Sequence, residues 1–110
     1  MSNIKKILES YFEHFSNKNI IALEQLFSED IKLNDWEISA IGKKEVVEAN
    51  KKIFNSVDTI NVKLKELYID KFTATCLIEI LVNQKEKLKV IDLIKFNKDN
   101  KITYISAYKQ

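Results

Sequence analysis

The chain has 110 residues, the length of a single domain, and 45% of them are apolar, which is enough for a packed core. No apolar run comes near the roughly 20 residues of a membrane-spanning helix, and the charged amino terminus holds no apolar signal core, so we expect one cytoplasmic domain, residues 1–110, without a membrane partner. The formal net charge is +2, and all 18 basic residues are lysines interleaved with acids, which is typical of a solvated surface and argues against a nucleic-acid partner.

The amino-terminal part of the chain predicts two helices. Apolar residues at helical spacing indicate an amphipathic first helix, which Ser2 or Asn3 can cap and which residues 17–19 interrupt. A short second helix follows, with Phe27 among its apolar residues, and residues 28–30 end it. The apolar stripe of the first helix is formed by Ile4, Ile7, Leu8, Tyr11, Phe12 and Phe15.

A short strand and a third helix come next. Residues 31–35 alternate between apolar and polar side chains, as a half-buried strand does. After an irregular stretch, Gly42 precedes a helix that extends from residue 43 to about residue 55. The side of this helix that we expect to be buried carries Val46, Val47, Ala49, Asn50, Ile53 and Phe54.

The second half of the chain predicts four consecutive strands joined by turns. In the first of them the alternation changes phase, which indicates a bulge near residues 65–66. Consecutive hairpins imply a mixed or antiparallel sheet, and three helices must cover one of its faces. The expected fold class is therefore α+β, in the order helix, helix, strand, helix and four strands. These strands cover residues 60–69, 73–83, 88–97 and 101–109.

Three polar side chains occur at places where the pattern calls for apolar ones. Asp92 lies in the middle of the more apolar face of the third of the four strands, where loss of water raises the pKa of an unpaired carboxyl group. Asp35 continues the apolar face of the short strand, and Tyr11 lies within the stripe of the first helix. Each residue alone is compatible with a structural role. One shared cavity would satisfy all three, which makes them candidate site residues.

Composition also excludes several kinds of site. Cys76 is the single cysteine and lies within an apolar run, so we expect a buried core thiol and no internal disulfide. The chain has no cluster of His, Cys and carboxylate residues at metal-ligand spacing, and its one glycine cannot form a phosphate-binding loop. We therefore expect neither a metal ion nor a cofactor.

The order and spacing of these segments resemble the nuclear-transport-factor-2-like superfamily, which includes SnoaL-like cyclases and ketosteroid isomerase. The similarity covers nearly the whole chain. It rests on the helical residues 11–15 (YFEHF) and 26–30 (LFSED), the glycine-to-helix step at 42–45 (GKKE), and the last hairpin at 90–96 (VIDLIKF) and 99–102 (DNKI). The resemblance implies a cone in which a strongly curved sheet wraps around three helices, with a pocket at the open end and a homodimer formed through the sheet.

Ketosteroid isomerase gives the sharper comparison. Laid along this chain, its oxyanion-hole tyrosine falls on Tyr11, its general-base aspartate on Asp35 and its protonated oxyanion-hole aspartic acid on Asp92. The resemblance thus implies a pocket for a small apolar molecule with a carbonyl group, and proton transfer of the isomerase or cyclase type. The residues expected to contact the ligand are His14, Trp36, Phe54 and Tyr108.

A second hypothesis stays open from the sequence. The chain can instead be a non-catalytic domain that dimerises or binds a partner protein, with a cone filled by side chains. In that case Asp92 is tied up by internal hydrogen bonds. Whether the protein is an enzyme depends on whether the three polar groups converge on an open cavity. The side chains that would fill the cone are Trp36, Phe54, Phe72 and Tyr108.

Overall fold

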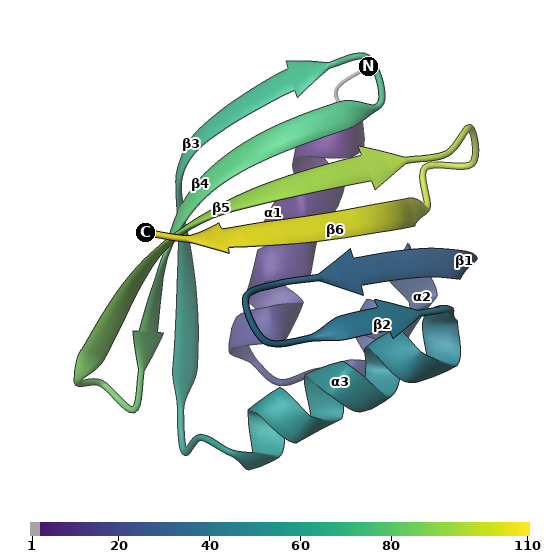
Figure 1. The fold of residues 1–110 in the computed structure, drawn as a ribbon. Coiled ribbons are helices and arrows are strands. Elements are labelled where there is room, and N and C mark those ends of the chain that lie inside the picture. Colours follow the sequence, from purple (N-terminus) through teal and green to yellow (C-terminus); the bar gives the residue numbers. More distant parts are fainter. Residues whose placement is uncertain (1–2) are drawn as a thin grey trace.

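The computed structural model describes residues 3–110, and within them three helices precede most of a six-stranded sheet (Figure 1). This arrangement confirms the predicted α+β class and the expected order of the helices and of the last four strands. The elements are α1 (Asn3–Ser16), α2 (Ile20–Leu26), β1 (Phe27–Asn34), β2 (Ser39–Ile41), α3 (Lys43–Asn55), β3 (Ile60–Asp70), β4 (Thr73–Val82), β5 (Glu86–Phe96) and β6 (Ile102–Lys109).

The sheet is mixed and strongly curved. Its strand order is β2-β1-β6-β5-β4-β3, and every described neighbour pair is antiparallel except β1 and β6, which are parallel. The register between β3 and β4 shifts between Leu64 and Glu66, which confirms the predicted bulge. A bulge increases the local twist of a strand. Figure 1 shows β3, β4 and β5 bending at this level, so that the sheet curls around α1.

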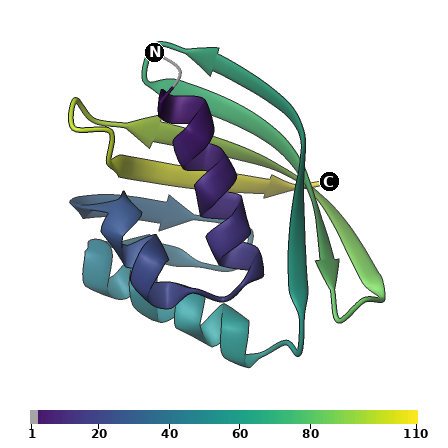
Figure 2. The same cartoon turned by 180° about the vertical axis from the view of Figure 1, so that it is seen from behind.

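The helices lie on the concave side of this sheet. Figure 2 shows α1 crossing the concave face, while α2 and α3 lie beside β1 and β2. The stripe of α1 faces the sheet, and Leu8 in its middle has no exposed surface. Asn19 caps α2, because its side chain accepts a hydrogen bond from the Ala22 backbone amide at 3.1 Å. Gly42 enters α3 with a φ of 91°, a conformation that glycine adopts without strain.

Two parts of the fold differ from the prediction. Phe27 begins β1 instead of ending the second helix, because it pairs with Ile102 of β6 and is almost wholly buried there. The stretch expected to be irregular contains β2, whose Ala40 pairs with Leu33 of β1. Both differences arise from pairing with a partner strand, which a local pattern of side chains does not report. Ser2, the alternative cap of α1, lies outside the described residues.

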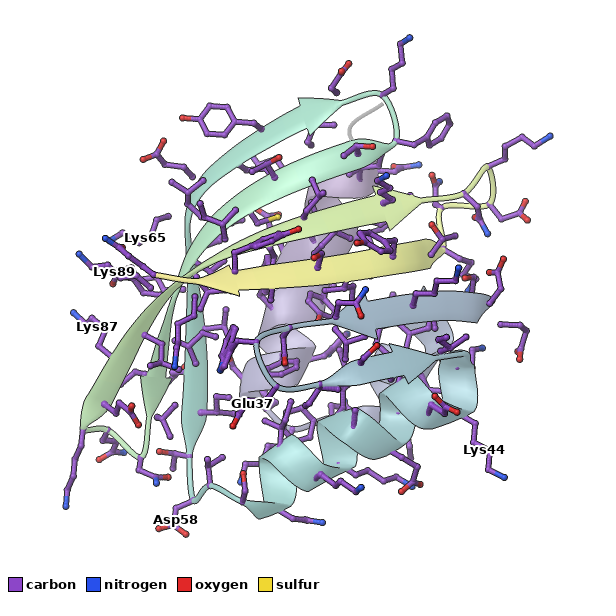
Figure 3. The ribbon with its side chains drawn as sticks, viewed as in Figure 1. Glu37, Lys44, Asp58, Lys65, Lys87 and Lys89 are labelled. Carbon is purple, nitrogen blue, oxygen red and sulfur yellow. The ribbon has the colours of Figure 1, made fainter. Side chains whose placement is uncertain are left out.

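Charged side chains cover the outer surface. Figure 3 shows Lys65, Lys87 and Lys89 pointing away from the helices at the bend of the sheet. The ion pair between Lys43 and Glu29, at 3.2 Å, includes a glutamate side chain that is 89% exposed, so it adds little stability. Among residues 3–110, none of the helices is long and apolar enough to cross a membrane.

Candidate functional site

A cavity of about 350 Å³ lies between the concave face of the sheet, α1 and the carboxyl-terminal half of α3. This volume falls at the lower end of the range of small-molecule sites. The cavity exists because the bent strands β3, β4 and β5 turn their inner faces toward α1 and α3 without contacting them everywhere. Most of its wall is aliphatic and includes Ile60, Val62, Ile78, Ile80, Leu88 and Val90.

Tyr11 and Asp92 bring polar groups into this apolar wall. The stripe of α1 turns Tyr11 inward and the alternation of β5 turns Asp92 inward, and the two residues are 5% and 6% exposed. The Tyr11 hydroxyl and the Asp92 carboxyl group form no hydrogen bond with any residue of the range 3–110. Within that range, every side-chain nitrogen or oxygen atom that is fully enclosed by protein has a hydrogen-bond partner. Both groups are therefore open to the cavity.

The surroundings of these two groups raise their pKa values. Burial, with the nearby negative charge of Asp35 as a second cause, raises the pKa of the Asp92 carboxyl group from 3.8 to about 7. Burial also raises the pKa of the Tyr11 phenol well above its ordinary value, with smaller contributions from Asp92 and Cys76. Tyr11 is consequently a hydrogen-bond donor at neutral pH, and Asp92 can be one as well. Tyr11, Asp92 and Asp35 all line this one cavity.

Asp35 follows the end of β1 at the mouth of the cavity and is half-buried. Its Oδ1 atom accepts hydrogen bonds from the backbone amides of Glu37 and Ile38, at 2.7 and 2.6 Å. Its own backbone amide donates to the Ile38 carbonyl oxygen at 2.8 Å. The turn thus holds the carboxylate in one position beside the cavity, and Figure 3 shows Glu37 in the same turn.

Cys76 lies beside Asp92 but has a different character. The two residues are partners in the pairing of β4 with β5, and Cys76 is fully buried, in agreement with the expected core thiol. Burial, and secondarily the charge of Asp92, raises the pKa of the Cys76 thiol to about 12. A thiol that keeps its proton at neutral pH is a poor nucleophile.

Among the residues expected to contact a ligand, Trp36 lines the mouth of the cavity. Trp36 is 40% exposed, and the Lys109 Nζ atom lies 5.2 Å from its ring centroid. Phe54 is not among the described residues that line the cavity. It packs edge-on against Phe15 with ring centroids 4.8 Å apart, and Phe15 is the side chain that lines the cavity. Phe54 therefore supports the wall from behind.

His14 and Tyr108 are likewise not among the described residues that line the cavity. His14 is half-buried on α1, at the edge of the stripe that Tyr11 centres. Tyr108 pairs with Ile91 on the convex face of the sheet and is 57% exposed, because the alternation of β6 turns its neighbour Ala107 inward instead. We therefore do not assign these two residues, or Phe54, to the cavity.

Comparison with known proteins agrees with the observed fold. A family model described as a SnoaL-like domain matches residues 4–92, which is most of the chain. The chain belongs to the SnoaL-like domain family. This confirms the resemblance noted in the sequence, whereas a search of curated proteins finds no match.

Solved structures share the fold of this SnoaL-like domain. A protein from Shewanella denitrificans, provisionally described as a SnoaL-like polyketide cyclase, is similar with a TM-score of 0.88 at 8% identity, over 100% of this chain and 92% of that one. An NTF2-like protein of unknown function from Cytophaga hutchinsonii has a TM-score of 0.82 at 12% identity, over 97% and 89% of the two chains. A Catenulispora acidiphila protein with a ketosteroid isomerase-like fold, in complex with trimethylamine, has a TM-score of 0.84 at 16% identity, over 93% and 83%. Identities this low show the fold alone.

The cavity of this SnoaL-like domain contains one buried polar residue that was not predicted as a site residue. Asn50 of α3 lines the cavity and is 3% exposed. In the sequence, Asn50 is a polar residue on the apolar side of the third helix, just as Asp92 is a polar residue on the apolar face of its strand. At the mouth, the exposed side chains of Glu37, Glu86 and Lys109 add charge. Within residues 3–110, no group of three or more His, Cys, Asp and Glu side chains could hold a metal ion.

Proposed function

We propose that this SnoaL-like domain binds a small, mostly apolar molecule with a carbonyl group and transfers a proton at the carbon next to that carbonyl. The observation that carries the proposal is the convergence of Tyr11, Asp92 and Asp35 on one apolar cavity. Tyr11 is a hydrogen-bond donor, Asp92 is one in its protonated form, and neither has a described protein partner, while the Asp35 side chain is held by its own turn. An apolar cavity with a few converging polar groups is the usual form of a small-molecule site.

In the proposed reaction, the Asp35 carboxylate removes a proton from the carbon next to the carbonyl group. The electron pair of the broken C–H bond moves onto the carbonyl oxygen and gives an enolate. Tyr11 and protonated Asp92 donate hydrogen bonds to this oxygen, where the negative charge develops. Asp35 then returns its proton to a carbon of the same molecule, which completes an isomerisation. Attack of the enolate carbon on a second carbonyl of the molecule would instead close a ring, and the alkoxide formed from that carbonyl would take the proton back from Asp35.

The competing hypothesis is a non-catalytic domain with a filled cone. The cavity volume of about 350 Å³ supports the ligand-binding hypothesis, as do the positions of the side chains that would have to fill the cone. Trp36 and Phe72 are 40% and 48% exposed, and Tyr108 faces outward. Two structural relatives, one provisionally described as a polyketide cyclase and one with a ketosteroid isomerase-like fold in complex with trimethylamine, also favour ligand binding.

Proton transfer can be measured before the natural substrate is known. The probe is 1-tetralone, a two-ring ketone, in D₂O, where NMR follows the exchange of the hydrogens next to its carbonyl group. We expect the protein to accelerate this exchange and Asp35→Asn to abolish the acceleration, because the variant lacks the carboxylate to which the proposal assigns the proton transfer.

The matched control is Asp58→Asn, which changes an exposed aspartate outside the cavity, labelled in Figure 3, and which should exchange the probe like the unaltered protein. An exchange rate of the unaltered protein equal to that of buffer would refute the catalytic proposal. Equal acceleration by Asp35→Asn would remove Asp35 from it.

We also propose a homodimer formed through the convex face of the sheet. Tyr68, Ile91 and Tyr108 lie on this face and are 59%, 43% and 57% exposed, which is unusual for side chains of this size. Light scattering should give twice the chain mass of 12.9 kDa, and the double variant Ile91→Lys and Tyr108→Lys should give the mass of one chain. A monomer mass for the unaltered protein at high concentration would contradict this arrangement.

A further inference from the structure

The buried polar residues of the cavity wall do not all lie at the same place. Among residues 3–110, the lining residues that are both buried and polar are Tyr11, Asn50 and Asp92. The proposed function uses Tyr11 and Asp92 and leaves Asn50 without a role.

The side-chain amide of Asn50 has no described protein partner. Within residues 3–110 the amide forms no hydrogen bond, whereas every side-chain polar atom that is fully enclosed by protein has a partner. The Asn50 amide is therefore not fully enclosed and is open to the cavity that the residue lines. At 3% exposure it is the most deeply buried polar residue of the wall. An amide that is removed from bulk water without a partner destabilises a fold, and a position of this kind is expected where the partner is a ligand.

Asn50 approaches the cavity from another wall than Asp92. It belongs to α3, which packs against β1 and β2, whereas Asp92 belongs to β5. In the strand order, β6 lies between β1 and β5, so two strand spacings, about 10 Å, separate β5 from the strand beside α3. The two residues thus come from separate walls, and a ligand that spans the cavity can contact Tyr11 and Asp92 with one part and Asn50 with another.

We propose that Asn50 determines the specificity of this cavity by binding a second polar group of the ligand. An amide both donates and accepts hydrogen bonds, so the second group is a hydroxyl or another carbonyl. The ligand class is then a hydroxyketone or diketone with an apolar body between its two oxygens. This inference rests on the proposed function, because it assumes that the first carbonyl group is held by Tyr11 and Asp92.

The first test compares two ketones that differ by one hydroxyl group. The probes are 1-tetralone and 6-hydroxy-1-tetralone, which carries the hydroxyl at the end of the ring system opposite the carbonyl. NMR titration should show that the unaltered protein binds the hydroxyketone roughly 5-fold more tightly, the gain of one hydrogen bond. In Asn50→Leu this ratio should fall to about one. A ratio near one in the unaltered protein, or an unchanged ratio in the variant, would overturn the role of Asn50.

The second test needs no ligand. Removal of an amide without a protein partner should raise the melting temperature, so we expect Asn50→Leu to melt at least about 4 °C higher than the unaltered protein. Asn55→Leu, on the exposed end of the same helix, controls for the higher helix propensity of leucine. A lower melting temperature of Asn50→Leu would show that Asn50 stabilises the fold through protein contacts and would overturn the inference. If neither ketone binds the unaltered protein, the proposed function fails, while this melting comparison still decides whether Asn50 is a structural residue.

Discussion

Asp92→Asn preserves the size of the side chain and removes its ionisation, so its effect on stability must depend on pH. The folded protein holds the Asp92 proton with a pKa of about 7, against 3.8 for an ordinary aspartate. Between these pH values the folded protein binds more protons than the unfolded chain, and its free energy of unfolding falls as the pH rises. The difference of about 3.2 between the two pKa values corresponds to about 4 kcal/mol, which is fully expressed above pH 7.

Asparagine has no ionisable carboxyl group, so the variant does not lose this free energy of unfolding as the pH rises. We expect the free energy of unfolding of Asp92→Asn to exceed that of the unaltered protein by about 4 kcal/mol at pH 8, relative to their difference at pH 4. Urea unfolding at a series of pH values measures both proteins under the same conditions. Asp70→Asn, which changes an exposed aspartate at the end of β3, should follow the unaltered protein at every pH.

Two results would refute this reasoning. A stability difference that does not change between pH 4 and pH 8 would mean that Asp92 ionises with an ordinary pKa. A stability difference that shifts in favour of the unaltered protein between pH 4 and pH 8 would mean that the ionised carboxylate has stabilising partners. Either result would also remove Asp92 as the neutral donor of the proposed reaction.

Three further predictions concern the cavity. Tyr11→Phe should slow hydrogen exchange of 1-tetralone by roughly 100-fold in the NMR assay, because one donor to the enolate oxygen is lost, and an unchanged rate would contradict this. The exchange rate catalysed by the unaltered protein should fall as the pH rises through about 7, since Asp92 then loses its proton, and a rate that stays constant from pH 6 to pH 9 would contradict it. Ile80→Phe should fill part of the cavity and weaken probe binding in an NMR titration, whereas Leu81→Phe, whose side chain points to the other face of β4, should bind like the unaltered protein.

Local side-chain patterns were enough to predict most of the fold. The helices α1 and α3 and the four strands β3–β6 follow from spacings of 3.6 and 2 residues, which depend on the backbone alone. The bulge beside Leu64 was visible as a change of phase in the alternation. The start of β1 at Phe27 was not predictable in this way, because it depends on parallel pairing with a strand 75 positions later in the chain, at Ile102. The three residues of β2 are too few to show an alternation.

The alternation along residues 88–97 was enough to predict that Asp92 lies on the inner face of its strand, because one residue more or less would reverse every side chain of β5. The helical spacing likewise identified Tyr11 as part of the buried stripe of α1. That these groups meet in a cavity with Asn50 in another wall, and that Tyr108 faces outward, became visible in the folded structure alone. The reason is that the cavity is the space left between a bent sheet and two helices. Its size depends on the curvature of the sheet and on contacts between distant segments, which no local pattern contains.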